Sequence, residues 1–438
     1  MPEAERLIAR FSAKQATVGI VGLGYVGLPL VRAMHGAGHR VVGFDIDESK
    51  VRMLRQGQAY LKHLGDELVQ TLASSDRFMP TSRPGDLAGC DAIVLCVPTP
   101  LGEHREPDLT FVERSTEMVA SVLQKGMLVS LESTSYPGTT RKICQTILER
   151  GGLRCGRDFF LVFSPEREDP GRKDMETHQI PRLVGGIDDV STRVGVALYS
   201  SAVERVIAVE SAEVAESAKL LENIYRAVNI ALVNELKPVL TDMGIDIWSV
   251  VRAASTKPFG FQPFYPGPGL GGHCIPIDPY YLSWKAREVG HVTRFIELAG
   301  EINSSMPRLV VERAARALND RGKPVKGSRV LLLGIAYKPD IDDIRETPAA
   351  EIITLLLERG AVVSYHDPHV ARFPSMRNYT LDLAGVPLTA EALAHADCVM
   401  IVTNHAAVDY GLVAKHATLI VDTRDAMREY PGPNVVKG

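Results

Sequence analysis

The chain has 438 residues, of which 45% are hydrophobic and 23% charged, and this length predicts two or three domains rather than one core. Its formal net charge of −4 supplies no electrostatic reason to expect nucleic acid or an anionic membrane as a partner. No apolar stretch approaches the ~20 residues that span a bilayer, and residues 1–14 lack the apolar segment of a secretory signal. The six cysteines include no CxxC pair, so we expect a soluble, cytoplasmic protein without a disulfide framework or a metal site.

The first half of the chain alternates short apolar strands with helical segments. Strands are expected at residues 17–21, 40–44, 92–97, 128–131 and 160–163. A helix is expected over residues 28–37, where Gly38 ends it. Strand and helix alternating with short turns predict a doubly wound parallel sheet.

Long helices follow, and then a second α/β pattern. Residues 211–243 predict one helix broken near Pro238, and residues 292–319 predict another interrupted around Pro307. The chain then restarts, with strands expected at residues 329–333, 362–366, 399–402 and 419–421 and a helix at residues 347–359, which Thr347 and Pro348 begin. We therefore expect an α/β protein with two Rossmann-like doubly wound parallel-sheet domains joined by a long central helix.

A dinucleotide fingerprint follows the first expected strand. Gly22, Gly24 and Gly27 form GxGxxG between a strand and a helix, and Asp45 ends the next strand. Such glycines let a pyrophosphate approach the helix N-terminus, and an acidic residue at this place accepts from the ribose hydroxyls and favours NAD over NADP. The alternative is a glycine turn that serves packing alone. Thr99 and the pair Ser133 and Thr134 follow later strands and point to the same crevice, or are ordinary turn residues.

One thiol stands apart from the others. Cys274 follows a glycine-dense run, and Asp278 comes four residues later. Lys219 and Asn223 lie four apart on the long helix, where they either stabilise a developing oxyanion or form a solvated stripe. Glu166 follows a strand and is either a general base or part of a charged surface loop. For the remaining cysteines we expect buried structural thiols.

These motifs, in this order, resemble the UDP-glucose/GDP-mannose dehydrogenase family over nearly the whole chain. The matching blocks are residues 22–27, 132–134, 164–166, 218–223, 271–278 and 337–347. The resemblance implies oxidation of the C6 alcohol of a nucleotide sugar to a carboxylate, with two NAD⁺ and one water. It implies that Cys274 attacks the intermediate aldehyde, that the thiohemiacetal is oxidised to a thioester, and that the thioester is hydrolysed.

The resemblance also implies roles for individual residues. Lys219 and Asn223 would stabilise oxyanions, Asp278 would assist proton transfer, Glu166 would be the base for the alcohol or for water, and Thr134 would position water or the nicotinamide. The implied NAD contacts are Gly22, Gly24, Tyr25, Val26, Gly27, Asp45, Lys50, Thr99, Ser133, Thr134 and Arg345. The implied substrate contacts are Glu166, Lys219, Asn223, Lys257, Tyr265, Gly271, Lys338 and Arg424.

By the same resemblance we expect three domains. They are an NAD-binding domain at residues 1–208, a central helical domain at residues 209–322 that dimerises and carries the cysteine loop, and a UDP-sugar-binding domain at residues 323–438.

Four segments are similar to the UDP-N-acetylglucosamine 6-dehydrogenase branch, whose members supply uronic acids for bacterial surface polysaccharides. These segments are His273, residues 275–279, residues 132–138 and residues 164–171. UDP-N-acetylmannosamine and UDP-glucose stay open as alternative substrates. Two other classes also stay open: a non-catalytic protein that binds NAD or a nucleotide sugar, and a two-electron 3-hydroxyacid-type dehydrogenase, which needs no cysteine.

Overall fold

The structure is a computed structural model that describes residues 2–61, 65–167, 177–272, 274–374, 376 and 379–438. The chain divides into two compact units. The first unit is Met1–Glu222 with Tyr280–Val292, and the second is Asn223–Pro279 with Thr293–Gly438. Within the described ranges, no helix combines the length and the apolar composition needed to cross a bilayer.

The first unit is built around an eight-stranded sheet. Its strands are β1 (Thr17–Val21), β2 (Arg40–Phe44), β3 (Phe78–Thr81), β4 (Ala92–Leu95), β5 (Leu128–Leu131), β6 (Phe160–Phe163), β7 (Arg182–Gly186) and β8 (Val206–Ala208). Its helices are α1 (Pro2–Ser12), α2 (Gly27–Ala37), α3 (Glu48–Arg55), α4 (Asp66–Ala73), α5 (Thr110–Val122), α6 (Thr146–Leu148) and α7 (Asp189–Ser200), with a π-helical turn at Thr140–Gln145 before α6. Short 3₁₀ turns lie at Pro84–Leu87, Glu149–Gly151 and Thr177–Gln179.

The strand order in this sheet is β3-β2-β1-β4-β5-β6-β7-β8. Strands β1 to β6 pair in parallel, as the alternation of strand and helix predicts. The exception is β7, which runs antiparallel to β6 with Val162 opposite Gly186. The amino end of β7 therefore lies beside the carboxyl end of β6, at the edge where ligands bind in such sheets.

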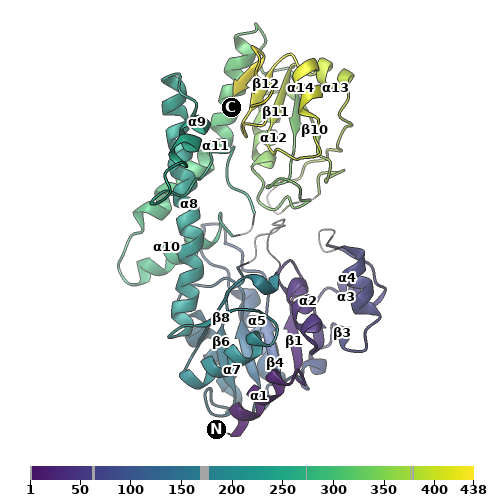
Figure 1. Cartoon of the computed structure of the whole chain (residues 1–438), viewed down its shortest axis with the longest axis vertical. Helices are drawn as coiled ribbons and strands as arrows, with labels where there is room; N and C mark the ends of the chain where they lie inside the picture. Colours follow the sequence, from purple (N-terminus) through teal and green to yellow (C-terminus); the bar gives the residue numbers. More distant parts are fainter. Residues whose placement is uncertain (1, 62–64, 168–176, 273, 375, 377–378) are drawn as a thin grey trace. The chain divides into compact units, whose positions relative to one another are not determined.

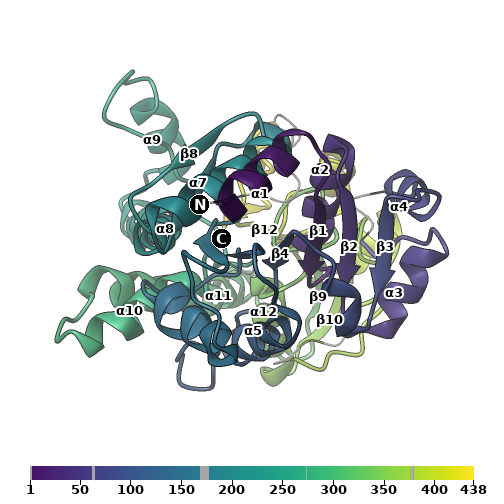
Figure 2. The same cartoon turned by 90° about the horizontal axis from the view of Figure 1, so that it is seen from below.

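Helices cover the sheet of the first unit because its strands are apolar on both faces. Val18, Ile20 and Val162 pack in one core with Leu7 of α1 and Leu198 of α7. Figure 2, a view from below, shows α1 beside α7, and these two helices contact each other. The expected stop of α2 is confirmed, since Gly38 has φ 110° and its N–H bonds back to the last turn.

The second unit holds a five-stranded parallel sheet in the order β10-β9-β11-β12-β13. Its strands are β9 (Arg329–Leu333), β10 (Val362–His366), β11 (Cys398–Ile401), β12 (Ile420–Asp422) and β13 (Val435–Lys437). Its helices are α9 (Ile247–Ala254), α11 (Arg294–Asn319), α12 (Pro348–Glu358), α13 (Ala390–His395) and α14 (Tyr410–His416). Figure 1 shows this smaller sheet in green and yellow.

Side chains of β9 alternate between two cores. Val330 and Leu332 pack with α11 and α12, whereas Leu331 and Leu333 pack with α13 and α14. Because both faces are buried, the strand reads as a continuous apolar run, and its expected range matches the observed one. Thr347 caps α12 through a bond from the Ala349 N–H, as its position before Pro348 predicts.

Two helices, α8 (Ala212–Asp242) and α10 (Asp278–Glu288), run through the boundary between the units. Figure 1 shows α8 as one unbroken helix, although we expected a break near Pro238. The interruption expected around Pro307 is also wrong, since Pro307 lies inside the continuous helix α11. A proline removes one backbone donor but leaves the rest of a long helix intact, so it does not force an end where tertiary packing holds both sides.

Candidate active site

The glycine turn after β1 has the geometry of a nucleotide site. Gly22 has φ 93°, and a Cβ there would lie 2.5 Å from the Cys96 carbonyl oxygen. A Cβ on Gly27 would lie 1.8 Å from the Gly22 oxygen, so the close approach of helix α2 requires glycine. Gly24 instead has no atom within 4 Å of its Cβ position, which leaves open space beside the turn. The turn thus offers room for a pyrophosphate next to the N-terminus of α2, where Tyr25 and Val26 precede the first helical residue.

Asp45 holds this turn from the end of β2. Its Oδ2 accepts from the Leu23 N–H at 2.9 Å, and its Oδ1 accepts from the Asp47 N–H at 2.9 Å. The Lys50 ammonium lies 3.3 Å from the same carboxylate. A carboxylate has about four acceptor positions, so Asp45 retains capacity for ribose hydroxyls. These residues fit an NAD molecule.

The ends of β4 and β5 are tied together beside the turn. The Ser133 hydroxyl accepts from the Val97 N–H at 2.9 Å and donates to the Val97 oxygen at 2.8 Å. Thr99 follows the end of β4, and Ser133 and Thr134 follow the end of β5, so all three lie at the carboxyl edge of the first sheet, as expected. Their side chains are buried.

The cysteine loop connects to helix α8 through a buried carboxylate in the second unit. Asp278 is fully buried, and its Oδ2 accepts from Asn223 Nδ2 at 2.6 Å. The Asp278 N–H donates to the Cys274 carbonyl at 2.8 Å. Cys274 itself is partly exposed. The structure thus brings together three residues that lie up to 55 positions apart in the sequence.

Glycines let this loop lie against the turn after β9. A Cβ on Gly271 would lie 2.5 Å from Tyr337 Cβ, and Gly272 has φ 83° with its N–H donating to the Arg345 carbonyl at 2.9 Å. The loop therefore passes directly beside the turn that carries Lys338. Arg345 is held by Asp343, with Nη2 2.6 Å from Oδ2.

The start of the loop approaches another substrate candidate. A Cβ on Gly267 would lie 2.6 Å from Arg424 Nη1, and Arg424 Nε donates to the Val402 carbonyl at 2.8 Å. Tyr265 stacks on Trp248 with ring centroids 5.2 Å apart. Lys257 is exposed and lies over the Phe259 ring.

Lys219 and Glu166 meet in the first unit. The buried Lys219 ammonium donates to the Glu166 backbone carbonyl at 3.0 Å. The Glu166 side chain is only 10% exposed and lies 3.3 Å from Arg182 Nη2. Both observations favour a positioned pair over a solvated stripe or a plain surface loop. Sequence reasoning missed Arg182, because β7 was not expected.

Four of the five other cysteines match the expectation of buried structural thiols. Cys90, Cys96, Cys144 and Cys398 are buried, and Cys155 is partly exposed. Burial raises the pKa of Cys90 to about 12 and raises that of Cys144 and Cys398 to about 12 as well. Thiols held in this protonated form are poor nucleophiles at neutral pH.

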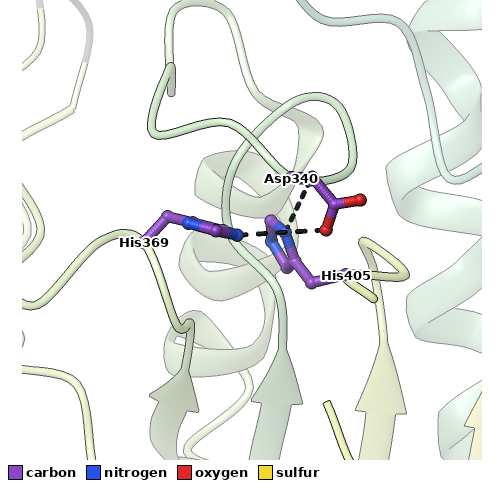
Figure 3. A group of neighbouring side chains, drawn as sticks. All are labelled: Asp340, His369 and His405. Atoms are coloured by element: carbon purple, nitrogen blue, oxygen red, sulfur yellow. Dashed lines mark hydrogen bonds and ion pairs between the residues drawn. The ribbon is translucent and has the colours of Figure 1, made fainter. Parts of the chain in front are cut away.

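A group with metal-ligand chemistry lies at the carboxyl edge of the second sheet. Asp340, His369 and His405 present ligand atoms that all lie within 4.8 Å of one another (Figure 3). His405 already uses both ring nitrogens, because Nδ1 accepts from the Asp340 N–H at 3.0 Å and Nε2 lies 3.0 Å from Asp367 Oδ2. Nδ1 therefore carries no proton and Nε2 donates to the carboxylate. A metal ion at His405 would have to break one of these bonds. Among the described residues, His369 Nε2 has no hydrogen-bond partner and lies 3.9 Å from Asp340 Oδ1.

The candidate site residues predicted from the sequence therefore form one group in the first unit and another in the second unit. His273 and residues 168–171, which carried part of the resemblance, lie outside the described residues.

Comparison with known proteins matches the chain to three domains of one family. Residues 16–203, 213–305 and 331–429 match the NAD binding domain, the central domain and the UDP binding domain of the UDP-glucose/GDP-mannose dehydrogenase family. The chain is 39% identical to the UDP-N-acetyl-D-glucosamine 6-dehydrogenase of Pseudomonas aeruginosa, over 85% of this chain and 88% of that one. It is 33% identical to the UDP-N-acetyl-D-mannosamine dehydrogenase of Methanococcus maripaludis, over 88% of this chain and 85% of that one. The solved UDP-D-ManNAc dehydrogenase of Pyrococcus horikoshii superposes with a TM-score of 0.86 at 32% identity, covering 96% of this chain and 98% of that one.

Proposed function

Because the chain belongs to the UDP-glucose/GDP-mannose dehydrogenase family and is an NAD-dependent nucleotide-sugar dehydrogenase, we propose that it oxidises the C6 hydroxyl of UDP-N-acetylglucosamine to a carboxylate. The observation that carries the chemistry is the connection from Asn223 through the buried Asp278 to the backbone of Cys274. A protein that only binds a nucleotide sugar needs no thiol on a loop whose backbone is fixed in this way. A two-electron dehydrogenase needs none either.

The cofactor site is the turn of Gly22, Gly24 and Gly27 with Asp45 beside it. NAD, when bound, accepts one hydride in each of the two oxidations. In this proposal Tyr25, Val26, Lys50, Thr99, Ser133, Thr134 and Arg345 complete its contacts. The Asp45 carboxylate repels a 2′-phosphate and so selects NAD over NADP.

The thiol traps the half-oxidised product. The Cys274 thiolate adds to the C6 aldehyde, and Lys219 and Asn223 stabilise the negative charge that develops on the oxygen. The second oxidation leaves a thioester on Cys274. Glu166 takes a proton from the attacking water, which releases the C6 carboxylate and returns the thiol. Asp278 moves a proton near the thiol, and Thr134 positions the water.

The substrate contacts in this proposal are Glu166, Lys219, Asn223, Lys257, Tyr265, Gly271, Lys338 and Arg424. We assign NAD binding to residues 1–208, dimerisation and the thiol loop to residues 209–322, and UDP-sugar binding to residues 323–438. UDP-N-acetylmannosamine is the second candidate, because dehydrogenases named for it are 32–33% identical to the chain. The product would be a uronic acid for surface polysaccharide, made in the cytoplasm.

We further propose that the enzyme is a homodimer through α8. In the part of α8 that belongs to the second unit, four large apolar side chains lie exposed at spacings of three, four and seven residues: Tyr225, Leu232, Leu236 and Val239. Residues at these spacings share one helix face, and an exposed apolar stripe on a long helix fits the same stripe on a second copy. Light scattering after size exclusion should give the mass of two chains, and Leu236→Glu should lower it towards one.

The activity is tested by the number of NADH molecules formed per sugar. The purified protein is mixed with NAD⁺ and, in parallel, with UDP-N-acetylglucosamine, UDP-N-acetylmannosamine and UDP-glucose. Two successive hydride transfers predict about two NADH per sugar consumed, and UDP-N-acetylglucosamine should give the highest kcat/KM. One NADH per sugar would indicate a two-electron dehydrogenase, and none with any sugar would remove the proposal. Cys274→Ser should abolish turnover, whereas near-normal activity in this variant would exclude the covalent route.

A further inference from the structure

Two buried carboxylates share one guanidinium at the carboxyl edge of the first sheet. Arg182 Nη1 lies 2.6 Å from Glu132 Oε1, and Nη2 lies 3.3 Å from Glu166 Oε2. The side chains of Arg182, Glu132 and Glu166 are 6%, 0% and 10% exposed. A planar guanidinium can bridge two acceptors in this way with fixed geometry, so it defines where both carboxylates point.

Strand direction explains how the three residues meet. Glu132 directly follows β5, Glu166 follows β6, and Arg182 is the first residue of β7. Because β7 is antiparallel to β6, its first residue lies where β5 and β6 end. A parallel β7 would have placed Arg182 at the opposite edge.

The two carboxyl oxygens of Glu132 differ in their contacts. The Tyr199 hydroxyl donates to Glu132 Oε1 at 2.6 Å, and the Arg182 guanidinium lies over the Tyr199 ring. Among the described residues, Glu132 Oε2 has no hydrogen-bond partner although it is buried. Burial raises the pKa of Glu132, and the Arg182 charge opposes this effect. A buried carboxyl oxygen without a hydrogen-bond partner lowers the stability of the folded protein, so we expect Glu132 to have a role beyond packing.

The charges around Glu166 supply that reason. The described charged groups that face it are Arg182, Lys219, whose ammonium bonds its backbone carbonyl, and Glu132 across the guanidinium. The neighbouring Arg167 turns away, towards Glu222 and the Pro181 carbonyl. The Arg182 charge is thus shared between the Glu166 and Glu132 carboxylates, while the Lys219 ammonium bonds the backbone of Glu166.

We propose that Arg182 and Glu132 are positioning residues for Glu166. Arg182 fixes the direction of the Glu166 carboxylate. Glu132 balances part of the Arg182 charge beside Glu166, the carboxylate that takes the proton from water or from the C6 hydroxyl. This inference rests on the proposed function, in which Glu166 is the base.

The test compares pH profiles of kcat/KM with UDP-N-acetylglucosamine, whose acidic limb reports the group that must be deprotonated in the free enzyme. Glu132→Gln keeps the shape and an oxygen acceptor for Tyr199 but removes the negative charge, so the limb should move to lower pH by about one unit. Arg182→Gln should move it to higher pH. Since Arg182→Gln leaves a buried acid without its cation and is liable to misfold, the limb of Glu132→Gln is the decisive measurement. The double variant Glu132→Gln/Arg182→Gln then shows whether the shift depends on the Arg182 charge. With both charges gone, its limb should return close to that of the unmodified enzyme.

Glu213→Gln is the matched control. Glu213 pairs with Arg141 at 2.6 Å in the same unit but does not contact Glu166, so its limb should stay in place. A limb that stays at the control position in Glu132→Gln, with only a lower rate, would overturn the inference and leave the proposed function standing. A double variant whose limb stays where Glu132→Gln puts it would overturn it as well. Failure of the unmodified enzyme to form NADH from any UDP-sugar would instead remove the proposed function, and this inference with it.

Discussion

Removal of the Asn223 amide should disable the thiol loop without unfolding the protein. Asn223 Nδ2 donates to Asp278 Oδ2 at 2.6 Å, and the Asp278 side chain is fully buried. A hydrogen bond to a buried charged group contributes about 1.5–3 kcal/mol. At ~1.4 kcal/mol per factor of ten, Asn223→Ala should lower kcat/KM by about 10- to 150-fold. Because the same amide is proposed to stabilise the developing oxyanion, most of the loss should fall on kcat.

The control for this variant lies on the same helix. Asn229→Ala removes an amide that donates only to the Tyr225 carbonyl at 2.7 Å, on an exposed face. Initial NADH rates at saturating NAD⁺ would be measured for both variants, with circular dichroism to verify folding. Equal kcat/KM for Asn223→Ala and Asn229→Ala would refute the connection from α8 to Cys274.

Three further outcomes follow from the structure. Asp45→Ala removes the acceptor of the Leu23 N–H, so KM for NAD⁺ should rise by about tenfold or more and the preference over NADP⁺ should weaken; an unchanged KM in steady-state kinetics would contradict the cofactor site. Lys219→Ala should lower kcat by about 10²–10³, and a rate within error of the unmodified enzyme would remove its oxyanion role. Although burial opposes it, bonds from His405 and backbone N–H groups lower the pKa of Asp367 from 3.8 to about 2. Because its pKa is lower in the folded state, the ionised Asp367 stabilises the folded protein by about 2 kcal/mol above pH ~4. This contribution is lost as the pH falls to ~2. The melting temperature of Asp367→Asn should therefore differ from that of the unmodified protein at pH 7 and converge with it near pH 2.

Much of the local structure could be predicted because it depends on neighbouring residues. The strands at Leu128–Leu131 and Phe160–Phe163 have the expected bounds, since a strand buried on both faces must be apolar throughout. Gly38 and Thr347 end and begin helices through their own backbone and side-chain chemistry. Prolines misled the prediction at Pro238, because their local cost is small against the packing of a long helix.

The candidate residues were also visible in the sequence, but their relations were not. Spacing alone left Lys219 and Asn223 equally compatible with a solvated stripe. The structure buries Lys219 on the Glu166 carbonyl and joins Asn223 to Asp278. Contacts across 53 and 55 positions of chain depend on how the elements pack, which no local pattern encodes.

By itself the sequence determined most of the strands, the glycine turn, the candidate thiol and the family of chemistry, since each follows from short-range residue types. Only the tertiary structure decided that β7 runs against β6 and brings Arg182 to Glu132 and Glu166. The physical reason is that strand direction is set by pairing with a distant neighbour. An arginine at the start of a strand therefore lies at either edge of a sheet, and only the pairing decides which.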